Sequence, residues 1–76
     1  MPVPTLRDYN KAINALDSLR ERHGKLLADM PPEVVEDHVL LASLVDAAAC
    51  DTPIDADDLR AMRAAIRRWC AREVGG

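Results

Sequence analysis

The chain has 76 residues, of which 49% are hydrophobic and 30% charged, and its formal net charge at pH 7 is −3. This length and composition indicate one globular domain, near the size at which a single hydrophobic core only just offsets chain entropy, so a buried catalytic cleft has little room. No apolar run approaches the ~20 residues of a membrane-spanning helix, and the first residues lack the basic-then-apolar order of a signal peptide. We therefore expect a soluble, cytoplasmic protein.

The first predicted helix covers residues 5–30. Thr5 is the expected N-cap, and Pro31-Pro32 stops the helix because proline cannot donate a backbone hydrogen bond and disfavours helix before it. Gly24 is a weak point inside this segment. Mainly apolar residues at spacings of three and four predict a seam along which this helix packs against a long neighbouring helix. The seam consists of Leu6, Tyr9, Ile13, Leu16, Leu27 and Met30, and it is interrupted by Arg20 and His23.

The second predicted helix covers residues 32–50. It should begin at Pro32, with acidic residues at the positive end of the helix dipole. Residues 39–45 are apolar around nearly the whole circumference, which is typical of a helix that is central or faces a second chain. We expect this helix in the middle of the bundle, and a homodimer would cover its remaining apolar surface.

The third predicted helix covers residues 55–73, with Asp55 as N-cap. Its apolar stripe is predicted to contain Leu59, Met62, Ile66 and Trp69, and the far side carries Arg60, Arg63 and Arg67. Taken together, the three segments predict an all-α fold, a small three-helix bundle of antiparallel helices with short proline-marked links.

Acidic residues are concentrated in the middle of the chain, because residues 31–53 contain five of them and no Lys or Arg. Glu33, Glu36 and Asp37 share one helix face, and Leu40 and Leu44 continue that face. An acidic edge beside exposed leucines suits a protein partner with a basic groove. We predict a small inhibitor or adaptor that occludes a site on a larger assembly, such as a nucleic-acid-binding one, as phages encode against host machinery. The alternative for these residues is dipole complementation, with the leucines in the core.

The arginines of the third helix support a different function. Arg60, Arg63 and Arg67 could contact nucleic acid, as in a small transcriptional regulator, because guanidinium groups pair with phosphates and guanine edges. The negative net charge makes direct nucleic-acid contact the less favoured prediction. The alternatives for these arginines are a solvated face that complements the helix dipole and a contact with an acidic protein. An uninterrupted exposed arginine stripe that lies away from Asp57 and Asp58 would favour nucleic-acid contact, whereas pairing with acids of the second helix would disfavour it. A purely structural oligomerisation module is the third alternative.

Metal binding and catalysis are not predicted. Cys50, Cys70, His23 and His38 match the ligand count of a Cys₂His₂ zinc site, but the nearest two are 12 residues apart, whereas structural zinc ligands come in close pairs. We expect both cysteines in the core, no metal and no cofactor. Serine and cysteine lie on predicted helices without a nucleophile elbow or a glycine-rich loop, so we expect no enzyme activity.

Overall fold

The computed structural model describes the backbone of residues 2–24 and 26–75, and the side-chain surroundings of residues 2–24 and 26–69. It contains three α-helices, α1 (Leu6–His23), α2 (Pro32–Ala49) and α3 (Ala56–Gly75), and a 3-10 turn, η1 (Leu27–Asp29). The described backbone has no strand. The predicted all-α three-helix bundle is confirmed.

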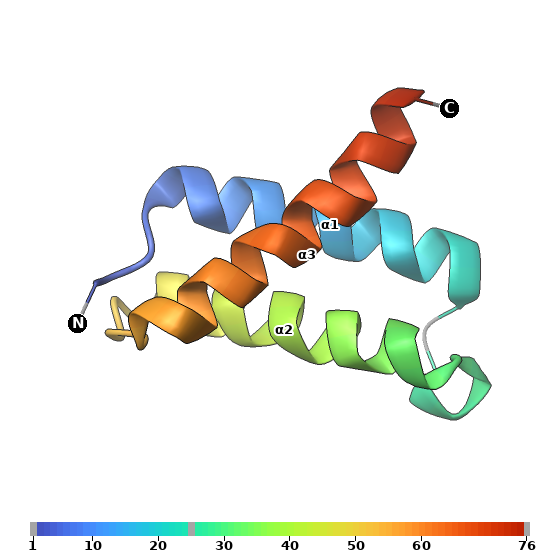
Figure 1. Cartoon of the computed structure of the whole chain (residues 1–76), viewed down its shortest axis with the longest axis horizontal. Coiled ribbons are helices and arrows are strands. Elements are labelled where there is room, and N and C mark those ends of the chain that lie inside the picture. The colour runs from blue at the N-terminus through green and yellow to red at the C-terminus, as the bar shows by residue number, and fades with distance from the viewer. Residues whose placement is uncertain (1, 25, 76) are drawn as a thin grey trace.

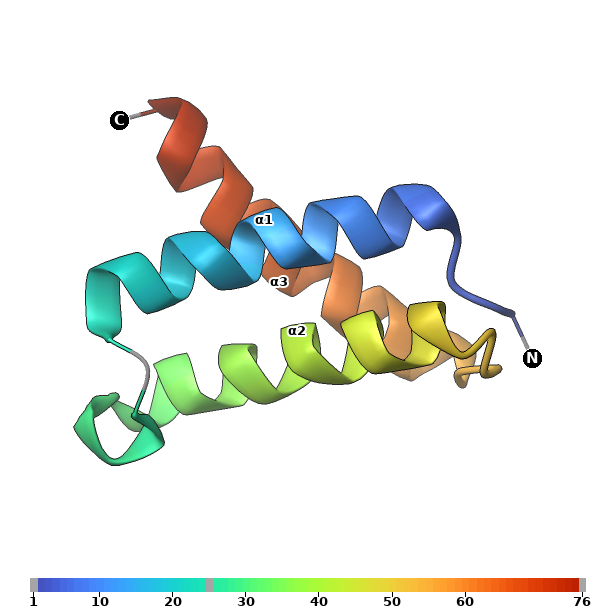
Figure 2. The ribbon, with the colours of Figure 1, turned by 180° about the vertical axis from the view of Figure 1, so that it is seen from behind.

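The three helices form two layers (Figure 1). α1 and α2 lie side by side and antiparallel, and α3 crosses obliquely over one face of this pair and contacts both helices. Figure 2 shows the opposite face of the pair, which α3 does not cover. The prediction that the second helix lies in the middle is therefore wrong. One side of α2 faces solvent, and Val39 on that side is 51% exposed.

Local signals set both ends of α1. The Thr5 hydroxyl accepts a hydrogen bond from the Asp8 amide at 3.1 Å, and the Asp8 carboxylate accepts from the Thr5 amide at 3.0 Å, which together form a capping box. At the other end, the Gly24 amide donates to the carbonyl of Arg20 at 2.7 Å. Gly24 has φ +83° and ψ −178°, a conformation that is essentially restricted to glycine. The helix therefore ends at His23, and the predicted continuation to residue 30 is wrong.

The starts of the other two helices agree with the predictions. α2 begins at Pro32, where the missing amide hydrogen is not needed. α3 begins directly after Asp55, whose side chain accepts a hydrogen bond from the Asp57 amide at 3.2 Å. Both starts depend on residues that act locally.

The core is largely aliphatic and takes residues from all three helices. Its members are Ala12, Ala15, Leu16, Leu19, Met30, Val34, Leu41, Leu44, Ile54, Leu59, Met62, Ala65, Ile66 and Trp69. The predicted stripe of the third helix is confirmed. The predicted seam of the first helix is confirmed at Leu16 and Met30, which are buried. It is wrong at Leu6, which is 75% exposed, and Ala12, Ala15 and Leu19 are buried instead. α1 has two neighbours, and its buried face is centred between them.

Two smaller findings complete the fold. Cys50 is exposed and not in a disulfide, so the expectation that it lies in the core is wrong, and the side chain of Cys70 lies outside the described residues. None of the described helices is both long and apolar enough to cross a bilayer.

Candidate functional site

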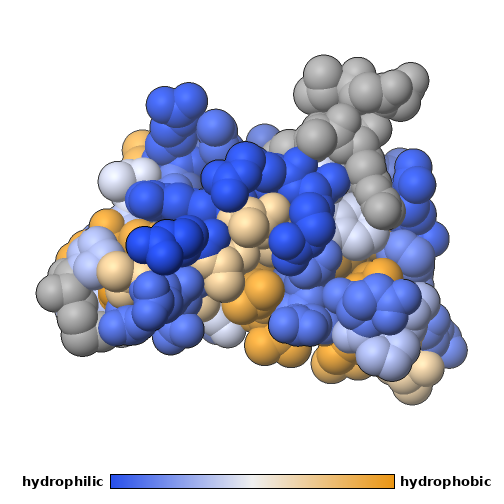
Figure 3. All heavy atoms as spheres, in the orientation of Figure 1, coloured by the Kyte–Doolittle hydropathy of each residue, from blue (hydrophilic) through white to orange (hydrophobic). Residues whose placement is uncertain are grey.

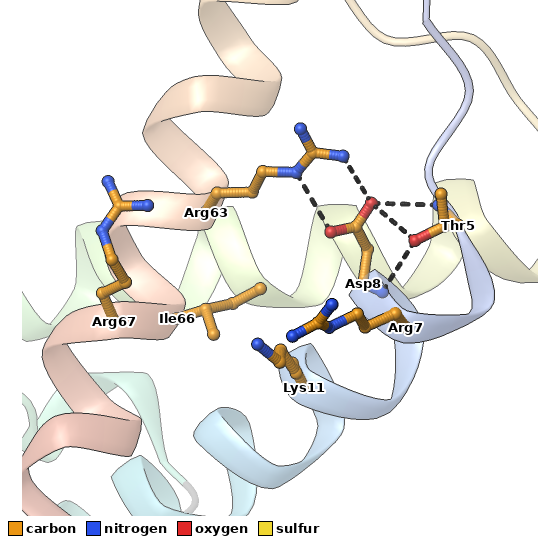
Figure 4. A pocket seen from close by; sticks show the side chains of 7 residues that line it. All are labelled: Thr5, Arg7, Asp8, Lys11, Arg63, Ile66 and Arg67. Carbon is orange, nitrogen blue, oxygen red and sulfur yellow. Dashed lines mark hydrogen bonds and ion pairs between the residues drawn. The ribbon is translucent and has the colours of Figure 1, made fainter.

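A hollow of 360 Å³ lies between α1 and α3, and basic side chains dominate its lining (Figure 4). The lining residues are Thr5, Arg7, Asp8, Lys11, Arg63, Ile66 and Arg67. We use the name basic surface for Arg7, Lys11, Arg60, Arg63 and Arg67, because Arg60 lines an adjoining hollow together with Arg63 and Arg67.

Helix geometry explains how these residues meet. Arg7 and Lys11 are four residues apart on α1, and Arg63 and Arg67 are four residues apart on α3, so each pair shares a helix face. The crossing of the two helices places both pairs around one hollow, with Ile66 between them. Figure 3 shows that the α3 side of the molecule is mainly hydrophilic, with apolar atoms along its lower edge over α2.

An ion pair between Asp8 and Arg63 joins the two helices at the hollow. Arg63 donates from Nε to Asp8 Oδ1 at 3.0 Å and from Nη2 to Oδ2 at 2.8 Å. These bonds lower the pKa of Asp8 to about 2, against a desolvation penalty that acts in the opposite direction, and the Thr5 amide contributes further lowering. The same pair raises the pKa of Arg63. Among the described lining residues, Asp8 is the one carboxylate, and it is therefore ionised at neutral pH and paired with Arg63.

The arginine stripe of α3 is partly interrupted. Arg60 pairs with Asp57 at 3.4 Å, but both side chains are more than three-quarters exposed. Such exposed pairs contribute little to the stability of the fold. Arg68 pairs with Asp37 of α2 through two hydrogen bonds. That contact to the second helix involves none of the three arginines predicted to bind nucleic acid.

The structure divides the predicted acidic site. Glu33 and Glu36 are exposed and line a hollow between α2 and α3. Asp37, the third acidic residue of that predicted site, is partly buried and is held by Arg68 and by Trp69, whose Nε1 donates to Asp37 Oδ2 at 2.9 Å.

The two leucines of that site also differ. Leu40 is half-buried and packs against the core, whereas Leu44 is fully buried. The prediction of an exposed Leu44 is wrong, and the alternative that places it in the core is confirmed. Leu44 lies seven residues after Asp37 and therefore shares the face of α2 that meets α3.

Of the four residues considered for zinc, the structure describes the side chains of His23, His38 and Cys50, and these three do not form one site. His38 Nε2 accepts a hydrogen bond from Arg20 Nε at 3.4 Å, and burial, followed by the charge of Arg20, lowers the pKa of His38. The ring of His23 packs edge-on against Trp69, with 5.5 Å between the ring centroids. Within the described residues, no three His, Cys, Asp or Glu side chains are close enough to hold a metal ion together.

Sequence reasoning did not identify Arg7, Asp8 and Lys11. The local signals were present, since Thr5 and Asp8 have the spacing of a capping box and Arg7 and Lys11 are four apart. Nothing in the sequence, however, pairs this face of α1 with the arginine face of α3.

Guanidinium and ammonium groups from two helices thus converge on one hollow, and this chemistry can bind phosphate groups. Comparison of the chain with known protein families, with curated proteins and with solved structures gives no match.

Proposed function

We propose that the chain is a small nucleic-acid-binding protein that contacts phosphates through the basic surface. The observation that carries this proposal is the convergence of Arg7, Lys11, Arg63 and Arg67 around a hollow whose described lining contains a single carboxylate. Arg67 is exposed, and each exposed guanidinium can form paired hydrogen bonds with a phosphate. Binding also releases counterions from the nucleic acid, which makes the affinity dependent on salt.

The negative net charge of the chain is compatible with this function because the acidic excess lies in one segment. Outside residues 31–53, ten Lys and Arg residues outnumber eight Asp and Glu residues. Five acidic residues lie within residues 31–53, whereas the basic surface is formed by α1 and α3. Such a distribution directs one side of a protein toward a polyanion and turns the remainder away from it. The basic surface is now favoured over the acidic site because Leu44 and Asp37 are engaged inside the molecule.

Fluorescence anisotropy of short labelled DNA and RNA duplexes tests the proposal. Arg67→Ala should weaken binding by about 3-fold to 10-fold and reduce the slope of log K against log salt by about one. Arg22→Ala is the matched control, because Arg22 is an exposed arginine at the other end of α1 and its loss changes the net charge equally. The proposal would be contradicted if neither duplex binds at low salt, or if both variants lose the same amount of affinity.

A protein-binding inhibitor or adaptor is the second candidate function. It is supported by the exposure of Glu33 and Glu36 beside the hollow that Val34 and Trp69 help to line. Glu33→Lys with Glu36→Lys should abolish capture of a protein partner from nuclease-treated native lysate. Asp37 must stay unchanged in this experiment, because it holds Arg68 and Trp69. Capture that is equal for the variant and the wild type would remove this site from consideration.

A further inference from the structure

Figure 2 shows the face of the α1/α2 pair that α3 leaves uncovered. Residues of this pair and of its connecting segments line two hollows. The first is lined by Ile13, Leu16, Asp17, Arg20, Ala42, Val45 and Asp46. The second is lined by Pro4, Leu6, Tyr9, Ala48, Ala49 and Asp51. Neither lining includes a described residue of α3 or a member of the basic surface, so the two surfaces are separate.

The two hollows follow one another along the same seam. Tyr9 lies about one turn before Ile13 on α1, and Ala49 lies about one turn after Asp46 on α2. Because the helices are antiparallel, both steps lead in the same direction. We call the combined feature the α1/α2 groove.

The groove offers apolar surface to a partner. Leu6 is 75% exposed, Ile13 and Val45 are half-buried, and Leu16 lies at the base of the first hollow. Apolar side chains at intervals along a groove between two helices match the apolar stripe of a third helix, which repeats every three or four residues.

The charges beside the groove are predominantly acidic. Asp17 and Asp46 line the first hollow and Asp51 lines the second, whereas Arg20 is the one basic residue among the described lining residues of both hollows. Arg20 is directed to His38, and no ion pair within the described part of the chain engages Asp17 or Asp46. A partner with Lys or Arg beside its apolar stripe would neutralise these carboxylates.

We propose that the α1/α2 groove binds a basic amphipathic helix of a partner protein. The apolar stripe of that helix packs along Leu6, Ile13 and Val45, and its basic flanks face Asp17 and Asp46. The groove and the basic surface lie on opposite sides of α1, so both can be occupied at once. This proposal does not rest on the nucleic-acid proposal.

A second copy of the chain is the less suitable occupant. Symmetric pairing through this groove would place the acidic linings of two copies against each other, and like charges across an interface are unfavourable. A second copy also has no spare amphipathic helix to insert into the groove, because each of its helices contributes its apolar face to its own core.

Titration of the ¹⁵N-labelled full chain with two synthetic helical peptides tests the groove. Both peptides carry the same leucine stripe, flanked by lysines in one and by glutamates in the other. The lysine peptide should shift the backbone signals of Ile13, Ala42 and Val45 and bind about tenfold more tightly than the glutamate peptide. Equal binding of both peptides, or shifts confined to α3 or to Glu33 and Glu36, would overturn the proposal.

A charge reversal distinguishes charge complementarity in the groove from nonspecific hydrophobic binding of the peptide. Asp17→Lys with Asp46→Lys should weaken binding of the lysine peptide by about tenfold and strengthen binding of the glutamate peptide. Glu21→Lys with Asp29→Lys is the control, because it makes the same charge change at exposed positions outside the groove lining. Equal effects in the two double variants would contradict the proposed contacts.

Sedimentation of the wild type identifies the alternative occupant. A monomer at NMR concentrations agrees with the proposal, whereas a dimer that dissociates when Ala42→Glu is introduced would assign the groove to a second copy. The duplex titrations of the basic surface are read separately, so either proposal can fail without the other.

Discussion

At the scale of single residues, Asp8 is the most strongly perturbed group in the described structure. Its pKa is lowered from 3.8 to about 2 in the folded chain, mainly by the hydrogen bonds from Arg63. Because the unfolded chain binds a proton more readily than the folded chain, this contribution to stability is present above the ordinary pKa. It is lost as the pH falls from about 4 to about 2, and it amounts to at most about 2 kcal/mol.

Asp8→Asn should therefore reduce the free energy of unfolding at neutral pH by about 1–3 kcal/mol and remove part of its dependence on pH below 4. Urea titrations at several pH values measure both quantities. Asp57→Asn is the control, because its side chain is 84% exposed and its pair with Arg60 should contribute little. An Asp8→Asn chain with the same acid dependence as the wild type would show that the pair with Arg63 does not form in solution.

The sequence predicted the residues that act locally, as Thr5 and Asp55 illustrate, because a capping side chain bonds to an amide two or three positions away. It did not predict the role of Asp8 at the hollow. Arg63 lies 55 positions further along the chain, and only the packing of α3 on α1 brings the two together.

At the scale of elements, Gly24 determines where α1 ends. Its φ of +83° with an extended ψ is essentially a glycine conformation, while an added Cβ would meet no atom within 4 Å. Gly24→Ala should therefore destabilise the chain through backbone strain alone, by about 1–3 kcal/mol. Thermal and urea unfolding measure the loss.

A synthetic chain with D-alanine at position 24 provides the control, because this φ and ψ are the mirror image of an extended conformation that L-residues adopt freely. The D-alanine chain should be at least as stable as the wild type, since it has fewer unfolded conformations than glycine. Equal destabilisation by both alanines would mean that the site is crowded rather than strained.

The predicted first helix is too long because a local sequence pattern does not include the tertiary contacts that end the helix. Residues 24–30 contain only one glycine and no proline, so the pattern favoured helix up to Pro31. The chain has to reverse, however, so that α2 returns along α1 and Met30 reaches the core. Gly24 and η1 make this reversal, and the helix loses the residues beyond His23.

At the scale of the whole molecule, a domain this small has a small core, so the loss of one core side chain removes a large part of its free energy of unfolding. Leu44→Ala should reduce the free energy of unfolding by about 2–5 kcal/mol, because it opens a cavity at a fully buried position. Leu40→Ala removes the same atoms at a half-buried position and should have a clearly smaller effect. Urea unfolding of both variants measures the difference, and equal losses would contradict the burial of Leu44 beneath α3.

The sequence by itself determined the number of helices, their starts and the buried stripe of α3, because prolines, capping residues and apolar spacing act within a few residues. Only the tertiary structure decided which face of α1 is buried, that Leu44 belongs to the core, and that Arg7 and Lys11 join the arginines of α3. The reason is the oblique crossing of α3 over both other helices. The crossing covers one face of the α1/α2 pair and leaves the other open, and a periodic pattern within one helix carries no information about the direction from which its neighbours approach.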